Sequence, residues 1–424
     1  MNRKLSYLAR KGVIMLSTWF TRAAVAAFIG VATTGAAASS ASSPAIRAKT
    51  TVVVRGTYRP GALTGAAYRV IDRGTPGGKV VLDVPIAFNN TGQIVGLAND
   101  GYRPADPLKQ GVCEIYDGSR FRTLSVTEVT CIPAGMNDEV HGTLEVVAVA
   151  STPYFGNVAT IFVDSPATHA IVAHDFINNS ASAAFGINGF GEAIGLAYYD
   201  PITPFEGSPP FIFYADGSQK LLQPTCTTQK RGCGVLDPTA SYFPPDFSLL
   251  CPFGGCRITN SGSTLLYDEA TGHYEVLYRG GAYLDLPQYI VPSQYYPIMI
   301  NNAGKVLFAE ENFPGDVVTT SVQQVGANHA TQVPAISGSS CQDYVPLSMN
   351  NKGEVLGYTK TCPSNDATFF TYDSRNGTQD LKTLIPVGSP PIQAYAVNDN
   401  GEILISTNTN FPYHWGILRP TSGK

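Results

Sequence analysis

The chain of 424 residues has 28 basic against 32 acidic side chains, a net charge of −4, and charged residues make up only 14% of it. With so few basic residues and no basic stripe, a nucleic-acid-binding surface is excluded. Glycine (42), proline (30) and tyrosine (22) are abundant, which is typical of a loop-rich, all-β extracellular protein.

The first 50 residues have the features of an export signal and a linker. Basic residues between Arg3 and Arg22 precede an apolar run at 23–38, which ends in three alanines. This is the layout of a secretory signal peptide. We therefore expect a signal over 1–38, a flexible linker over 39–50 and no transmembrane span in the mature chain. An uncleaved anchor helix is the alternative, but the run is short for roughly 30 Å of hydrocarbon.

A phrase made of an apolar residue, asparagine, a short polar stretch and glycine, followed by an apolar run, recurs along the chain. It reads AFNNTGQIVGL at 87–97, GINGFGEAIGL at 186–196, MINNAGKVLFA at 299–309, SMNNKGEVLGY at 348–358 and AVNDNGEILIS at 396–406. Asparagine tolerates left-handed backbone angles and glycine adopts them freely. Each copy therefore predicts a tight β-hairpin.

A second phrase follows most of these hairpins. It reads EIYDGSRFRTL at 114–124, IFVDSPATHAIV at 161–172, FIFYADGSQKLL at 211–222, LLYDEATGHYEVL at 265–277 and FTYDSRNGTQDLKTL at 370–384. Each is an aromatic-rich strand, a turn containing aspartate and another strand. A unit therefore holds two hairpins, or four antiparallel strands.

The period of the unit follows from its asparagine turns. They lie at Asn90, a degraded Asn137, Asn188, Asn302, Asn351 and Asn398. The spacing is about 50 residues, except for a double interval after Asn188. We place a fourth unit in that interval, with 265–277 as its second hairpin and Pro252–Gly255 as its first turn. The count is then seven units.

Four-stranded units of this length predict a β-propeller of about seven blades over 51–420, with a stacked solenoid as the alternative. The last unit supplies only three strands before the chain stops, whereas AYRVIDRGTPGG at 67–78 resembles the last strand of a unit. We expect this N-terminal strand to complete the last blade and close the ring, which leaves no sheet edge to cap.

Eight cysteines fall along the chain as local pairs: Cys113 and Cys131, Cys226 and Cys233, Cys251 and Cys256, and Cys341 and Cys362. An even number in an exported chain predicts disulfides, although eight cysteines allow 105 connectivities. We favour consecutive pairing because each bond would then close one hairpin or loop. No CxxC spacing indicates a zinc site.

The succession of YRVIDRGTPGG and FNNTGQIVG resembles the extracellular HAF-repeat proteins of bacteria over roughly 67–419. The resemblance implies secretion and a propeller-like fold, and it implies no settled reaction. One element departs from the family pattern. Pro210-Phe211, Thr368-Phe369 and His414-Trp415 stand near the places where the family has His-Ala-Phe.

No motif for chemistry or for a cofactor emerges. The sequence lacks HExxH, GxSxG and GxxxxGK[ST], and we assign no catalytic residue, metal site or cofactor. Acidic neighbours such as Glu310 and Glu311 leave open a polysaccharide-acting hydrolase or lyase, which would need two carboxylates facing each other across a substrate.

Tyrosines in the long connections give the strongest functional indication. The candidates for ligand contact are Tyr198, Tyr199, Tyr283, Tyr289, Tyr295 and Tyr296. Aromatic loops on a rigid scaffold suit a carbohydrate or a peptide, whereas aromatic residues that only fill space between blades are the structural alternative. We expect a secreted, periplasmic or cell-surface binding propeller. An envelope or matrix scaffold for extracellular protein contacts is the second hypothesis, and the enzyme is the third.

Overall fold

The computed structural model describes most of the repeat region. The described residues are 67–76, 84–98, 112–124, 130–138, 143–152, 156–165, 170–175, 182–197, 210–221, 247–249, 258–268, 273–277, 283–286, 293–312, 317–360, 362, 368–407 and 414–421. The signal peptide and linker predicted for residues 1–50 lie outside them.

The described strands form seven four-stranded antiparallel sheets, here numbered 1 to 7 in chain order. Sheet 1 holds β2 (Val84–Phe88), β3 (Ile94–Ala98), β4 (Val112–Tyr116) and β5 (Phe121–Thr123). Sheet 2 holds β6 (Thr130–Met136), β7 (Leu144–Thr152), β8 (Gly156–Ser165) and β9 (Ala170–Asp175). Sheet 3 holds β10 (Ser182–Ile187), β11 (Ala193–Ala197), β12 (Pro210–Phe213) and β13 (Gln219–Leu221).

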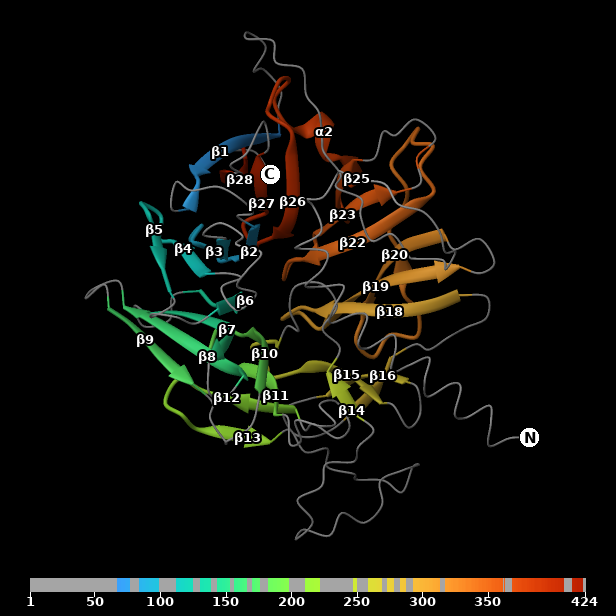
Figure 1. Cartoon of the computed structure of the whole chain (residues 1–424). Coiled ribbons are helices and arrows are strands. Elements are labelled where there is room, and N and C mark those ends of the chain that lie inside the picture. Colours follow the sequence, from blue (N-terminus) through green and yellow to red (C-terminus); the bar gives the residue numbers. More distant parts are fainter. Residues whose placement is uncertain are drawn as a thin grey trace, which may run out of the picture. The chain divides into compact units, whose positions relative to one another are not determined.

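The later sheets repeat the same order of strands (Figure 1). Sheet 4 holds β14 (Phe247–Leu249), β15 (Thr264–Asp268), β16 (His273–Leu277) and β17 (Tyr283–Asp285). Sheet 5 holds β18 (Ser293–Ile300), β19 (Lys305–Asn312), β20 (Val317–Gln324) and β21 (Thr331–Gln332). Sheet 6 holds β22 (Asp343–Met349), β23 (Val355–Lys360), β24 (Phe369–Asp373) and β25 (Gly377–Asp380), followed by the single-turn helix α2 (Leu381–Leu384).

Sheet 7 joins the two ends of the described chain. It holds β26 (Ile392–Val397), β27 (Ile403–Thr407), β28 (His414–Pro420) and β1 (Tyr68–Gly74). Strand β1 pairs with β28 from Tyr68 opposite Pro420 to Gly74 opposite Trp415, so that blue and red segments share one sheet in Figure 1. The prediction that the last unit supplies three strands, and the N-terminal segment a fourth, is confirmed.

The first strand of six sheets carries a β-bulge at the same place. Four of these bulges follow a proline: Pro85, Pro133, Pro297 and Pro346. Proline has no N–H to donate and is therefore tolerated at a bulge on an edge strand. Each of these prolines lies four residues before the first residue of the next turn, a regularity that the sequence analysis missed.

Apolar clusters fill the junctions between successive sheets. Cys113 and Ile115 of sheet 1 pack with Val146 of sheet 2, and equivalent clusters join sheets 2 and 3, 4 and 5, 5 and 6, and 6 and 7. A further cluster packs Ile94 and Tyr116 of sheet 1 against Leu404, Trp415 and Ile417 of sheet 7. Burial of apolar side chains on both faces explains why a central strand such as β27, with the sequence ILIST, is buried throughout.

The chain is thus an all-β β-propeller, as its four-stranded period predicts. The fourth unit differs from the prediction. Residues 265–277 form the second and third strands of sheet 4, not its second hairpin. Its first turn is Thr259–Ser263, and the region 252–255 lies outside the described residues. No helix in the described part of the chain is long and apolar enough to cross a membrane.

Candidate functional site

Seven corresponding turns, one in each sheet, make up what we call the turn crown; six begin with asparagine and the fourth begins with Thr259. Its members are Asn89–Gln93, Asn137 with Glu145, Asn188–Glu192, Thr259–Ser263, Asn301–Lys305, Asn350–Glu354 and Asn398–Glu402. In the sixth turn the Oδ1 atom of Asn350 accepts from the amides of Lys352 and Glu354 at 3.0 and 2.9 Å. Gly353 completes the turn at a φ of 85°, where an L side chain would be strained.

The first asparagine of a turn also holds the next turn. The Nδ2 atom donates to a backbone carbonyl in the neighbouring sheet. Among the described residues there are five such bonds: Asn89 to Asn137 (3.3 Å), Asn188 to Thr259 (2.9 Å), Asn301 to Asn350 (2.8 Å), Asn350 to Asn398 (2.8 Å) and Asn398 to Asn89 (3.1 Å). These side chains are buried, so each bond lies in a dry junction where an unpaired group would be costly.

The second residue of a turn makes a parallel set of bonds. Its amide donates to a side-chain oxygen of the second residue in the next turn: Asn90 to Asp138, Gly189 to Asn260, Asn260 to Asn302, Asn302 to Asn351, Asn351 to Asp399 and Asp399 to Asn90, at 2.7–2.9 Å. Gly189 has no oxygen to offer to Asp138. The recurrent asparagines therefore serve architecture, because their side-chain groups are taken up by neighbouring turns.

The acidic residues at the ends of the crown turns are also engaged. Asn188, Asn350 and Asn398 donate to the carboxylates of Glu192, Glu354 and Glu402 at 2.6–3.0 Å. Glu192 also accepts from the Tyr214 hydroxyl at 3.1 Å, and Glu402 pairs with Arg419. Among the described residues no group of three or more histidine, cysteine or acidic side chains could hold a metal ion.

Arg122 links sheets 1 and 2 through two aspartates. Its guanidinium forms an ion pair with the buried Asp164 and lies 3.0 Å from Asp117 Oδ2. Burial alone would raise the pKa of Asp117, but hydrogen bonds from Ser119 and the Arg120 amide, with the charge of Arg122, outweigh it and lower that pKa to about 2. This cluster ties two sheets together.

Glu114 is a carboxyl that the sequence analysis did not single out. It is buried on β4, where the Thr123 hydroxyl donates to it at 2.6 Å. Burial raises the pKa of Glu114, and the hydrogen bond from Thr123 partly offsets this effect. Glu310, one of the acidic neighbours noted in the sequence, accepts from Ser321 at 3.2 Å within its own sheet.

The predicted tyrosines do not gather into one described cluster. Tyr198, Tyr199 and Tyr289 lie outside the described residues. Tyr283 begins β17, the last strand of sheet 4, whereas Tyr295 and the half-buried Tyr296 lie near the start of β18, the first strand of sheet 5. Since the strands are antiparallel, the start of β17 and the start of β18 lie at opposite ends of their sheets.

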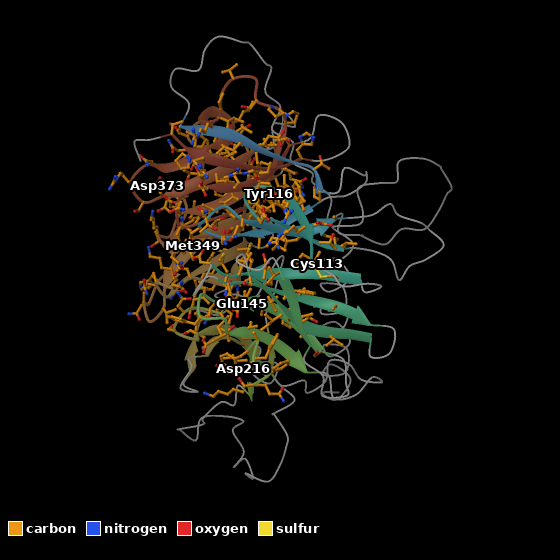
Figure 2. All side chains as sticks on the ribbon, turned by 90° about the vertical axis from the view of Figure 1, so that its left-hand side faces the viewer. Cys113, Tyr116, Glu145, Asp216, Met349 and Asp373 are labelled. Atoms are coloured by element: carbon orange, nitrogen blue, oxygen red, sulfur yellow. A yellow bond between two sulfur atoms is a disulfide. The ribbon has the colours of Figure 1, made fainter. Side chains whose placement is uncertain are left out.

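The two ends of the sheets differ in their connections. The crown occupies one end, which we call the turn end. The connections between second and third strands, and between one sheet and the next, leave from the opposite end, which we call the loop end; the longest is 222–246, followed by 99–111 and 198–209. In Figure 2, Asp373 and Met349 lie on the turn-end side of the molecule and Cys113 toward the other side.

Two of the four predicted disulfides lie in the described part of the chain, and both are confirmed. Cys113 bonds with Cys131 and so joins β4 of sheet 1 to β6 of sheet 2, and Cys341 bonds with Cys362 on either side of the β22–β23 hairpin. The other predicted pairs, Cys226 with Cys233 and Cys251 with Cys256, lie outside the described residues. Both described bonds are at the loop end.

Comparison with known proteins gives structural likeness only. No family model and no curated protein matches the chain. Similar solved structures include a virginiamycin B lyase from Staphylococcus aureus (10% identity, TM-score 0.46, covering 84% of this chain and 100% of that chain). An oligogalacturonate lyase from Vibrio parahaemolyticus matches at 9% identity and a TM-score of 0.48, over 84% and 92% of the two chains. A puromycin hydrolase matches at 9% identity and a TM-score of 0.43, over 81% and 52%. Likeness at this level carries no argument about what this chain binds or catalyses.

Proposed function

We propose that this chain is an exported binding propeller that recognises a carbohydrate or peptide ligand through connections at its loop end. Its seven sheets are the blades of one ring, which β1 closes by completing sheet 7. Contacts between successive sheets, including those from sheet 7 to sheet 1, support the ring. The proposal includes membership of the HAF-repeat family and a cleaved signal over residues 1–38.

The observation that carries the binding function is the position of the disulfides. Cys113–Cys131 and Cys341–Cys362 both cross-link strand ends at the loop end, whereas hydrogen bonds already hold the turn end together. A covalent cross-link limits the motion of the segments that leave the sheets there. Stiff segments lose less entropy on binding, so a cross-linked loop end suits ligand recognition.

Several of the candidate tyrosines could contact a ligand at the loop end. Tyr198 and Tyr199 directly follow β11 in the sequence and Tyr289 follows β17, and both strands end at the loop end. Tyr295 and Tyr296 lie near the start of β18, at the same end. Tyr283 begins its strand at the turn end and falls outside this group. Tyrosine offers a flat apolar face and a hydroxyl, which suits both sugar rings and peptide chains.

Two other functions stay open as alternatives. A scaffold for extracellular protein contacts would use the same rigid ring without a small ligand. A polysaccharide hydrolase or lyase would need paired carboxylates at the loop end, whereas the acidic residues at the ends of the crown turns are bound to asparagines or to an arginine.

Binding to an array of oligosaccharides and peptides tests the proposal, with a double variant, Tyr198→Ala with Tyr199→Ala, and a matched control. The control is Phe190→Ala, because Phe190 is an aromatic side chain that is 66% exposed and lies at the turn end. Loss of a wild-type ligand in the double variant, with retention in the control, supports the loop-end site. Equal loss in the control would contradict it. Turnover of a bound saccharide would identify the enzyme, and the absence of any ligand would favour the scaffold.

A further inference from the structure

The junction between sheets 7 and 1 gathers arginines on one face. Arg69 of β1 lies directly opposite Arg419 of β28, and Arg73 lies four residues further along β1. The Nη2 atoms of Arg73 and Arg419 lie 3.8 and 3.9 Å from the position that a Cβ atom would take at Gly92. The two guanidinium groups are therefore neighbours beside the first crown turn, although 346 positions separate them in the chain (419 minus 73).

The positive charge of this group is not balanced within the described residues. Arg419 pairs with Glu402 through its Nε atom. No described carboxylate pairs with Arg73, whose Nε is buried without a hydrogen-bond partner. The guanidinium of Arg73 instead lies over the ring of Tyr116, 5.3 Å from the ring centroid, in a cation–π contact. Like charges at close range repel each other, and an anion between them would relieve this repulsion.

Other junctions place different groups at the equivalent glycine. A Cβ at Gly401 would meet a carboxylate oxygen of Glu354 at 3.2 Å, and a Cβ at Gly353 would meet the ammonium group of Lys305 at 2.7 Å. Each of these neighbours is the last residue of the preceding crown turn. At Gly92 the preceding crown turn is that of sheet 7, and its last residue, Glu402, forms an ion pair with Arg419. Compared with the turn glycines Gly191, Gly304, Gly353 and Gly401, Gly92 alone has two guanidinium groups beside it.

We infer that Arg73 and Arg419 bind an oxyanion, either a carboxylate or a phosphate group, beside Gly92. The planar forks of guanidinium groups match both anions through paired N–H donors. Tyr116 keeps Arg73 oriented, and Glu402 holds Arg419 through Nε, which leaves the terminal nitrogens of Arg419 directed to a ligand. This site is separate from the loop-end tyrosines and does not depend on the function proposed above.

The same junction contains a spectroscopic reporter. The chain has two tryptophans, Trp19 in the predicted signal peptide and Trp415 in β28. Trp415 is fully buried and lies edge-on to Phe121 with the ring centroids 5.2 Å apart, and Phe121 in turn contacts Tyr116 at 5.2 Å. An anion that moves Arg73 over Tyr116 will therefore change the surroundings of Trp415.

The test is a fluorescence titration of the full chain carrying Trp19→Phe. Inorganic phosphate, a short uronic-acid oligosaccharide and its neutral counterpart are added at constant ionic strength. We expect a saturable change in Trp415 fluorescence with phosphate or with the uronic acid. The substitution Arg73→Gln should weaken binding about tenfold or more. The control Arg375→Gln removes an exposed arginine elsewhere and should bind as the wild type does. A response to the uronic acid alone identifies an acidic glycan as the ligand. A response to both anions identifies a general oxyanion site.

Two results would overturn the inference. One is the absence of a saturable response to either anion, and the other is an equal response in Arg73→Gln. Melting temperatures at low salt separate binding from a structural role. Without anion, Arg73→Gln should melt at the same temperature as the parent or at a higher one, because the substitution removes an unbalanced charge. With anion present, it should melt at a lower temperature than the parent. A large loss without anion, together with no effect of anion on the parent, would show that Arg73 only supports Tyr116.

Discussion

The Nδ2 atom of Asn398 donates to the backbone carbonyl of Asn89 at 3.1 Å, across 309 positions of the chain. The equivalent atom of Asn350 donates to Asn398 at 2.8 Å. One buried amide side chain thus connects each of these turns to the next sheet. Loss of this asparagine side chain should therefore weaken the junction between two sheets at the turn end.

Asn350→Ala should lower the free energy of unfolding by about 2–3 kcal/mol, because it leaves the buried carbonyl of Asn398 and two amides of its own turn without their partner. Denaturant unfolding followed by circular dichroism measures the loss. Asn376→Ala is the matched control. Asn376 lies in an exposed turn, where its side chain meets only Asp373, so we expect a change within about 0.5 kcal/mol. Equal losses in the two variants would contradict a special role for the crown.

Thr259→Asn should stabilise the protein by about 1 kcal/mol. Thr259 accepts from the Ser263 amide at 2.9 Å as an asparagine would, but its side chain is too short to reach the carbonyl of Asn301 in the next sheet. An asparagine would supply that missing donor. Denaturant unfolding of Thr259→Asn and Thr259→Val brackets the effect, since valine removes the acceptor as well. A lower stability for the asparagine variant would show that sheet 4 cannot form the repeated contact.

The two described disulfides should differ in their response to reductant. Cys113 and Cys131 are fully buried, whereas Cys341 and Cys362 are half-buried. A thiol reductant must reach a sulfur atom to open the bond, so graded dithiothreitol should open Cys341–Cys362 first. Alkylation followed by peptide mass spectrometry identifies the order. Prior labelling of Cys113 would contradict the prediction.

Replacement of either cysteine pair by serine should lower the free energy of unfolding by about 3 kcal/mol.

Glu114→Gln should raise the stability of the protein at neutral pH. Burial raises the pKa of Glu114 above its ordinary value of 4.5, so the folded state disfavours the ionised form and loses stability as pH rises through the folded pKa. Below pH 4.5 the carboxyl is neutral in both states, and the advantage of the glutamine should vanish. Melting temperatures of the two proteins between pH 4 and pH 8 test this. A constant difference across that range would rule out ionisation as the cause.

The four-stranded period of the fold could be predicted because the turns repeat a chemical requirement. Asparagine and glycine at fixed places indicate the hairpins, and alternation of apolar residues indicates the strands. Sheet 4 was assigned wrongly because Thr259 stands where the other turns have asparagine. The turn at Thr259 belongs to the crown because the Asn188 side chain donates to the backbone carbonyl of Thr259. Every residue type has a backbone carbonyl, so the sequence does not reveal this contact.

The candidate sites were less predictable, for a related reason. Arg73 and Arg419 come from opposite ends of the chain and meet only because β1 pairs with β28. Neither arginine belongs to a motif. Tyr283, by contrast, was grouped with Tyr295 and Tyr296 by its proximity in sequence, yet strand direction places it at the other end of its sheet. Proximity along a repeat does not indicate which end of a strand a residue occupies.

The amide of Thr421 donates to the carbonyl of Ala67 at 2.8 Å, so the first and last described residues are direct neighbours. A short linker could join them covalently without moving either strand. New termini could then be cut into the connection at 222–246, which leads from sheet 3 to sheet 4. Such a circular permutant would turn the β1–β28 pairing into an ordinary hairpin. Only residues 420–421, the linker and residues 67–72 would then lie between Arg419 and Arg73.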